Sequence, residues 1–258
     1  MQKSVSSPAP SAAPLLQWLV VLAILATIAV NALANILPIA GRQTGEISDS
    51  FPSFFTPAGY VFAIWGVIYL ALLAYAVYQA LPAQRDNPRL VATRGLFVLS
   101  CGFNVAWLLC WHYLLIVPSM AMMIGLLITL VLLYVRLGVG QFAASAAESW
   151  LARVPFSIYL GWITVATVAN AVTTLIELDW NGWGISGQVW ALLLVLVAAG
   201  IGVVFARGRR DVPFNLVLLW AFGGIWVAHA SEPVVVYGVV AGLLMVLAGL
   251  GVAFSRRS

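Results

Sequence analysis

The chain is organised as eight apolar runs of about 20 residues, the length that a helix needs to cross a bilayer. Short polar breaks, such as residues 38–42 and 207–211, separate the runs. Only 8% of the residues are charged, against roughly 25% in soluble domains. The sequence therefore predicts an all-α membrane protein, a polytopic bundle of about eight transmembrane helices. The runs comprise residues 15–38, 58–80, 92–113, 115–136, 153–177, 187–206, 213–230 and 233–254.

The placement of Lys and Arg predicts the orientation, because these residues are retained on the cytoplasmic side. With the N-terminus inside, all of the 12 Lys and Arg residues except Arg42 fall on the inner side. We therefore expect an integral membrane protein with both termini cytoplasmic, and the compact loops favour a bacterial inner membrane. The net charge of +4 reflects this topology, so the expected partner is the lipid bilayer and no nucleic acid is expected.

Two further segments carry information outside the runs. Residues 1–14, rich in Ser, Pro and Ala, predict a disordered tail. The connection at residues 39–57 is the longest and the richest in polar residues, and long ordered loops are often functional. No soluble domain is evident.

Small residues in the last run predict a close helix contact. Gly238 and Gly242 form a Gly-x-x-x-Gly pair, a spacing that lets another helix backbone approach closely. We favour internal packing over dimerisation as the reason for the pair, and a homodimer is left open.

Polar side chains in the runs gather in the outer half of the predicted membrane. Burying an unpartnered amide in hydrocarbon costs roughly 2–7 kcal/mol, so these positions are informative. The inner half offers no comparable set, which predicts a pocket that opens outward. The outer set comprises Asn31, Asn35, Asn104, Thr167, Asn170, Thr173, Thr174 and His229.

Helical spacing places aromatic and amide side chains on shared faces of three runs. Such faces suit a flat, largely apolar ligand with a few polar atoms. Two simpler explanations stand beside this one: tryptophans gather at membrane interfaces, and Asn104 and Asn170 could hydrogen-bond each other. The three faces are Phe62, Trp65 and Tyr69; Ser100, Asn104, Trp107 and Trp111; and Tyr159, Trp162, Ala166, Asn170 and Thr174.

The sequence carries no recognisable catalytic or metal-binding pattern. His112 and His229 lack a spacing that would make them metal ligands with Glu46 or Asp49. No nucleophile motif, phosphate loop or pair of intramembrane carboxylates is present. We therefore expect neither an enzyme nor a bound cofactor or metal, although redox-active tryptophans could serve a membrane enzyme that acts on a tetrapyrrole or lipid.

Three motifs resemble the translocator-protein or tryptophan-rich sensory protein (TspO/MBR) family. The first is Pro57-Ala58-Gly59-Tyr60-Val61-Phe62-Ala63-Ile64-Trp65-Gly66-Val67-Ile68-Tyr69. The second is Asn104-Val105-Ala106-Trp107, and the third is Tyr159-x-x-Trp162-x-x-x-Ala166-Thr167-x-x-Asn170. The family normally has five helices, so the resemblance implies a TspO-like bundle at 15–177 and three additional helices at 178–258. It also implies binding of tetrapyrroles, sterols or other hydrophobic aromatics within the bundle.

The leading hypothesis is a membrane receptor or sensor that binds a planar hydrophobic ligand in an outward-opening cavity. The walls would be Trp65, Tyr69, Trp107, Trp111 and Trp162, while Asn104 and Asn170 would orient the polar atoms of the ligand. Arg42 and Glu46 would form a lid, with Arg42 able to bind a ligand carboxylate through two hydrogen bonds. The alternative is a transporter or permease for a small hydrophobic molecule, although we find no internal repeat typical of transporters.

Overall fold

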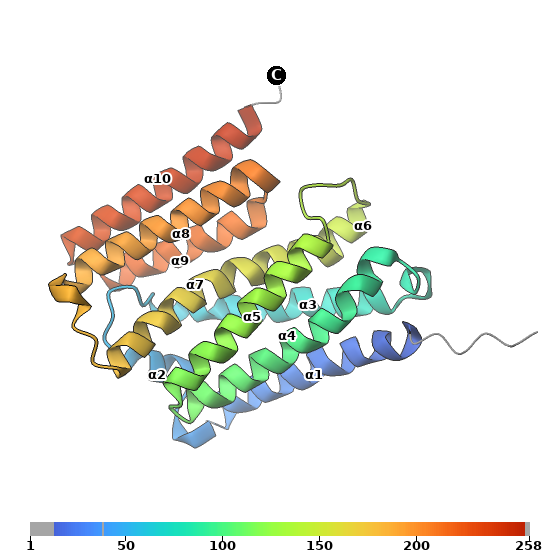
Figure 1. The fold of residues 1–258 in the computed structure, drawn as a ribbon, viewed down its shortest axis with the longest axis horizontal. Helices are drawn as coiled ribbons and strands as arrows, with labels where there is room; N and C mark the ends of the chain where they lie inside the picture. The colour runs from blue at the N-terminus through green and yellow to red at the C-terminus, as the bar shows by residue number, and fades with distance from the viewer. Residues whose placement is uncertain (1–12, 38, 256–258) are drawn as a thin grey trace, which may run out of the picture.

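A computed structural model describes residues 13–37 and 39–255, and within them the chain forms eight long helices joined by short segments (Figure 1). The long helices are α1 (Ala13–Ile36), α3 (Ile64–Ala80), α4 (Pro88–His112), α5 (Ile116–Arg136), α7 (Val154–Glu177), α8 (Gly187–Arg209), α9 (Val212–Ala228) and α10 (Pro233–Ser255). The short elements are η1 (Ile39–Gly41), α2 (Thr44–Asp49), η2 (Gly59–Ala63), η3 (Pro82–Gln84), α6 (Ala146–Glu148), the π turn η4 (Ser149–Arg153) and η5 (Gly182–Gly184).

The helices have the length and surface of membrane spans. Among the described residues, seven helical segments are long and apolar enough to cross a membrane, and α9, with 17 residues, is shorter. Large apolar side chains cover the outside of the bundle, such as Leu22, Leu70 and Val204 with 61%, 71% and 67% of their surface exposed. Soluble proteins rarely expose such continuous apolar surface. The prediction of a polytopic α-helical membrane protein is confirmed.

All eight predicted runs correspond to helices, with ends that differ by a few residues. The run predicted at 58–80 begins as the short helix η2 and continues as α3 from Ile64. Helix α4 begins at Pro88, before the predicted residue 92, because the Asn87 side chain accepts a hydrogen bond from the Arg89 amide and Pro88 occupies the first helical turn. The turn between α4 and α5 contains Leu114 at a φ of 55°. Residues 1–12 of the predicted tail lie outside the described residues, and α1 already begins at Ala13.

The first five long helices form a closed ring. Going round it, α1 packs against α3, α3 against α7, α7 against α5, α5 against α4, and α4 against α1. At one end the interior is filled by aromatic rings, with Tyr75 lying 5.1 Å from Phe97 and 4.8 Å from Phe156 between ring centroids. The cavities described below lie toward the other end.

Helices α8, α9 and α10 pack against one another along one flank of the ring, where α9 lies against α7 (Figure 1). The glycines of α10 face α8: a Cβ on Gly238 would lie 2.8 Å from the Leu192 Cα, and one on Gly242 would lie 2.8 Å from a Val195 methyl group. The prediction that this glycine pair serves internal packing is confirmed.

The two ends of the bundle differ in charge. The end that carries the connections 81–87, 137–153 and 210–211 holds the described Lys and Arg residues except Arg42, and we call it the basic end. There Glu148, which is 5% exposed, accepts from Arg89 at 3.1 Å and Arg153 at 3.3 Å. The opposite end carries the connections 37–63, 113–115, 178–186 and 229–232, and we call it the loop end.

The long connection between α1 and α3 crosses the loop end and ties the ring to the C-terminal helices. The Ala58 amide donates to the Gly224 carbonyl at 3.1 Å, and the Trp220 indole donates to the Val61 carbonyl at 3.1 Å. The His229 Nε2 lies 2.9 Å from the Thr56 carbonyl oxygen. This connection therefore lies over both groups of helices.

Candidate ligand-binding site

Five of the predicted aromatic residues form one cluster inside the ring. The Trp65 ring lies 5.4 Å from the Tyr69 ring and 6.3 Å from the Trp107 ring, at interplanar angles of 21° and 28°. Trp111 stacks on Trp107 at 5.8 Å, and Trp162 meets Trp65 edge-on at 6.2 Å. The four-residue spacing within α3 and within α4 puts each pair on one helix face. The sequence predicted these shared helix faces, and the ring of helices brings them together in one cluster.

A cavity of about 400 Å³ lies beside this cluster, between α1 and α3, and we call it the α1–α3 cavity. Its volume is within the range of roughly 300–1,000 Å³ that small-molecule sites occupy. Trp65, Tyr69 and Trp107 form its aromatic side, and Asn31 and Asn35 of α1 supply polar atoms opposite. The remaining lining residues are Ile28, Ala32, Ile36, Gln43, Thr44, Gly45, Gly59, Phe62, Gly66 and Leu108.

The rim of the α1–α3 cavity is open on the side of the bundle. Ala32 and Asn35 on α1 and Gly66 on α3 line the cavity and are exposed. The opening therefore lies on the outside of the bundle, between two helices that are long and apolar enough to cross a membrane. The glycine on α3 leaves the opening clear of a side chain.

Asn104 lies behind the wall of this cavity, at 0% exposure, and its side chain is engaged by protein partners. Its Oδ1 accepts from Asn31 Nδ2 at 2.9 Å, and its Nδ2 donates to the Tyr159 hydroxyl at 3.0 Å. Asn31 in turn lines the cavity. The Asn104 side chain thus fixes the orientation of Asn31, and it bonds Asn31 and Tyr159 rather than Asn170.

Asn170 holds the Trp107 indole. Its Oδ1 accepts from Trp107 Nε1 at 2.8 Å, and its Nδ2 donates to Ser119 Oγ at 3.1 Å. A small cavity of about 50 Å³ lies here and shares Trp65 and Trp107 with the α1–α3 cavity. Trp162, which also lines it, is 2% exposed, and its Nε1 has no hydrogen-bond partner in the described structure.

A model of the TSPO-like protein family matches residues 17–252. This chain belongs to the TSPO-like protein family. The match runs from α1 to α10 and so includes the three helices outside the ring. Membership of this family indicates, at a coarse level, that the chain is a membrane protein of the sensor or receptor type. Comparisons with curated proteins and with solved structures gave no match.

In this TSPO-like protein, hydrogen bonds hold the connection 39–57 over the aromatic cluster. The Trp111 indole donates to the Thr44 carbonyl at 3.2 Å, and His112 Nε2 lies 3.0 Å from Thr44 Oγ1. Glu46 is exposed and accepts from the Gln43 amide at 2.8 Å, so it caps the short helix α2. Arg42 is exposed too, and among the described residues its guanidinium has no hydrogen-bond or ion-pair partner.

Neither Arg42 nor Glu46 lines the α1–α3 cavity, whereas their neighbours Gln43, Thr44 and Gly45 do. Arg42 and Glu46 were predicted as lid residues because they are charged residues in an otherwise uncharged part of this connection. The polar contacts of Thr44 arise from the way α2 folds back over α4, which no local pattern reveals. Trp111 and Trp162 likewise line the small cavity rather than the larger one.

A polar set that the sequence did not predict lies toward the basic end of the ring, where no polar set comparable with the outer one was expected. Arg94 is 0% exposed, donates to Gln79 Oε1 at 3.0 Å, and donates to the Gln84 carbonyl at 2.8 Å. Gln17 donates to the Gln79 carbonyl at 2.8 Å, and Gln79 donates back to the Gln17 carbonyl at 3.0 Å. Gln17 and Gln79 lie near helix ends in the sequence, so their burial depends on how α1, α3 and α4 meet.

Proposed function

We propose that this TSPO-like protein is a receptor or sensor that binds a planar, largely apolar molecule in the α1–α3 cavity. The observation that carries the proposal is the stack of Tyr69, Trp65 and Trp107 along one side of a cavity of about 400 Å³, with Trp111 stacked on Trp107 behind this wall. Planar rings gain roughly 0.5–1.5 kcal/mol per aromatic pair beyond their buried area. A tetrapyrrole or a sterol-like ring system matches this wall.

The polar groups of the cavity would orient the ligand. Asn31 and Asn35 lie opposite the aromatic wall. The Tyr69 ring lines the cavity, and its buried hydroxyl has no hydrogen-bond partner among the described residues. A buried polar group without a partner costs about 1–3 kcal/mol, so a ligand atom that reaches this hydroxyl gains affinity. In this proposal Asn104 and Asn170 position Asn31 and Trp107 for the ligand.

Charges at the rim suit a ligand that carries a carboxylate. Arg42 precedes the cavity-lining segment 43–45 directly, and its guanidinium is free among the described residues. A guanidinium binds a carboxylate through two parallel hydrogen bonds. Glu46 stabilises α2 over the site, so this segment would act as the lid. Because Arg-rich ends are retained inside, we propose that the loop end faces out of a bacterial inner membrane.

The packed interior of the ring toward the basic end supports a receptor rather than a transporter. Arg94, Gln79 and Gln17 form a buried, hydrogen-bonded layer there, and the rings of Tyr75, Phe97 and Phe156 contact one another in tilted and edge-on arrangements. A transport path through the ring would have to break this layer. We expect proteoliposomes to bind labelled ligand without accumulating it, and net uptake that scales with internal volume would favour the transporter.

The test is a titration of the detergent-purified protein with protoporphyrin IX, read by quenching of tryptophan fluorescence. We expect saturable binding that weakens about fivefold or more in Trp107→Ala, because the variant removes one stacked ring, and several-fold in Asn104→Ala. Trp183→Ala is the matched control, since Trp183 is 75% exposed and lines neither of the two cavities inside the ring. Unchanged affinity in both test variants, or no saturable quenching, would contradict the proposal.

A further inference from the structure

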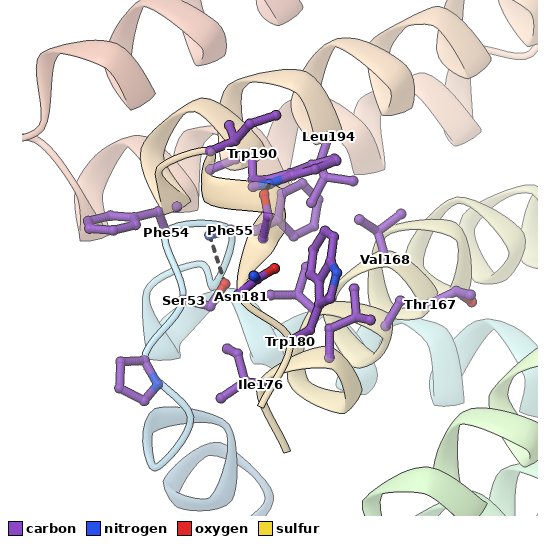
Figure 2. Close-up of a pocket in the computed structure, with 18 residues that line it drawn as sticks. Ser53, Phe54, Phe55, Thr167, Val168, Ile176, Trp180, Asn181, Trp190 and Leu194 are labelled. Atoms are coloured by element: carbon purple, nitrogen blue, oxygen red, sulfur yellow. Dashed lines mark hydrogen bonds between the residues drawn. The ribbon is translucent and has the colours of Figure 1, made fainter. Parts of the chain in front are cut away.

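A second, larger cavity lies outside the ring, between α7 and α8 at the loop end, with a volume of about 540 Å³ (Figure 2). Helix α8 packs along α9 and α10 but meets α7 at few positions, so the two helices leave a space between them. We call this space the α7–α8 cavity. The lining residues are Pro52, Ser53, Phe54, Phe55, Thr167, Val168, Ala171, Val172, Leu175, Ile176, Trp180, Asn181, Gly182, Ile185, Gly187, Trp190, Ala191 and Leu194.

The walls of this cavity are fixed by specific contacts. Trp190 Nε1 donates to the Gly182 carbonyl at 3.0 Å, and Gly182 has a φ of 64°, which favours glycine. The Trp190 ring lies 5.2 Å from the Trp180 ring. Phe55 is 1% exposed and anchors the connection over the ring, while a Cβ on Gly187 would lie 3.0 Å from the Phe54 ring. The cavity is therefore a built feature of the fold.

Its chemistry is apolar and uncharged. None of the 18 lining residues is ionisable, and Trp180, Trp190, Phe54 and Phe55 supply aromatic surface. In Figure 2 the indole of Trp180 stands in the middle of the lining side chains. A charged ligand would lose its hydration here without gaining a counter-charge. The occupant expected on these walls is a neutral ring compound.

Two polar side chains of the lining, Asn181 and Ser53, keep hydrogen-bond donors without a partner among the described residues. Asn181 Oδ1 accepts from the Trp183 amide at 3.0 Å, which leaves its Nδ2 hydrogens free among the described contacts. Ser53 Oγ accepts from the Phe55 amide at 3.1 Å, and its hydroxyl hydrogen has no acceptor among them. Figure 2 shows these two side chains near each other beside the connection 52–55. Free donors at one end favour a ligand with an acceptor atom, such as a carbonyl oxygen.

We propose that the α7–α8 cavity is a second binding site, for an uncharged ring molecule that carries a carbonyl acceptor at one end. The site is separate from the α1–α3 cavity, with which it shares no lining residue. The exposed residues Leu175 and Ile185 lie at its edge, so the ligand enters from the outer surface of the helices. Rings stack on the two indoles, and the carbonyl accepts from Asn181 and Ser53.

The probe for this site is Prodan, a neutral naphthalene ketone whose emission reports its surroundings. The protein is placed in phosphatidylcholine nanodiscs and titrated with Prodan under direct excitation, with empty nanodiscs subtracted. Because lipid is in large excess, saturable binding there means that the cavity prefers the ring ketone to acyl chains. We expect saturable binding, and a signal equal to that of empty nanodiscs would overturn the proposal.

Matched variants locate the probe. Leu194→Trp and Ala171→Phe fill the cavity from α8 and α7, and each should weaken binding at least tenfold. Leu193→Trp, on the exposed face of α8 with 40% exposure, should change it less than twofold. Loss in Trp107→Ala with retention in Leu194→Trp would place Prodan in the α1–α3 cavity and overturn the assignment.

A further variant tests the hydrogen-bond donor of Asn181 without changing the packed walls of the cavity. Asn181→Asp keeps the acceptor that caps the Trp183 amide, removes the free N–H donors and adds a negative charge. Asn181 is exposed on the surface connection, so the fold tolerates the change. We expect at least fivefold weaker binding of Prodan at neutral pH and an unchanged melting temperature. Affinity equal to that of the unmodified protein would overturn the carbonyl recognition.

Discussion

Two tyrosines that touch the same tryptophan allow a sharp test of the ring interior. The Tyr69 and Tyr159 rings lie 5.4 Å and 6.0 Å from the Trp65 ring. The Tyr159 hydroxyl accepts from Asn104 at 3.0 Å, whereas the Tyr69 hydroxyl has no partner among the described residues. Replacing each tyrosine with phenylalanine removes one oxygen atom and keeps the ring. The two variants therefore differ in a single hydrogen bond.

The expected loss of stability follows from that bond. Hydrogen bonds between membrane helices contribute about 0.6 kcal/mol on average and up to about 1.7 kcal/mol. Tyr159→Phe also leaves the Asn104 amide, which is 0% exposed, without one of its acceptors. We expect it to lower the free energy of unfolding by about 1–2 kcal/mol. Tyr69→Phe removes no hydrogen bond among the described residues, so it should change that free energy by less than about 0.5 kcal/mol, or raise it, because a buried unpaired hydroxyl is costly.

Ligand binding should show the opposite order. A hydrogen bond from a ligand atom to the Tyr69 hydroxyl would contribute about 0.5–1.5 kcal/mol, so Tyr69→Phe should weaken binding of protoporphyrin IX about two- to tenfold. Tyr159 does not line the α1–α3 cavity, and Tyr159→Phe should have the smaller effect on affinity.

The assay is reversible unfolding of each variant in mixed micelles of a mild detergent and sodium dodecyl sulfate, followed by circular dichroism. Binding is measured on the same preparations by fluorescence quenching. Equal destabilisation by the two substitutions would refute the reasoning, because the Tyr69 hydroxyl would then have to take part in a contact of similar strength. Equal affinities of Tyr69→Phe and the unmodified protein would remove this hydroxyl from the proposed site.

Two further predictions concern packing and charge. Gly238→Ala should destabilise the protein by about 1–3 kcal/mol, because the added Cβ would lie 2.8 Å from the Leu192 Cα. In the control variant Gly251→Ala the added Cβ meets nothing within 4 Å, so this change should be neutral. Equal melting temperatures for the two variants would contradict the close approach of α10 to α8. Burial raises the pKa of the Asp211 carboxyl above its usual value of 3.8, although hydrogen bonds from the Phe214 amide and Ser157 oppose the shift. Because the folded protein then binds this proton more tightly than the unfolded chain does, stability should fall as the pH rises from about 3.8 through the raised pKa. Asp211→Asn, which can still cap α9, should flatten that pH dependence of the melting temperature, and an unchanged slope would exclude this carboxyl as its source.

The membrane class, the eight helices and the aromatic faces were determined by the sequence alone. A run of about 20 apolar residues can satisfy its backbone hydrogen bonds in a bilayer only as a helix. The spacing of Trp65 and Tyr69, and of Trp107 and Trp111, then places each pair on one face of its helix whatever the helix packs against. The three motifs at 57–69, 104–107 and 159–170 together indicated the family, and the family match confirms it.

Tertiary structure decided which of these side chains reach a cavity and which serve as supports. Asn104 carries the same polar group as Asn31, yet the order of helices in the ring places Asn31 on the α1–α3 cavity and Asn104 behind it. The layer around Arg94 and the α7–α8 cavity were also invisible in the sequence. Both depend on contacts between segments far apart in the chain, and helical periodicity describes only one helix at a time. Helix faces are local properties, whereas cavities exist only where helices meet or leave a space.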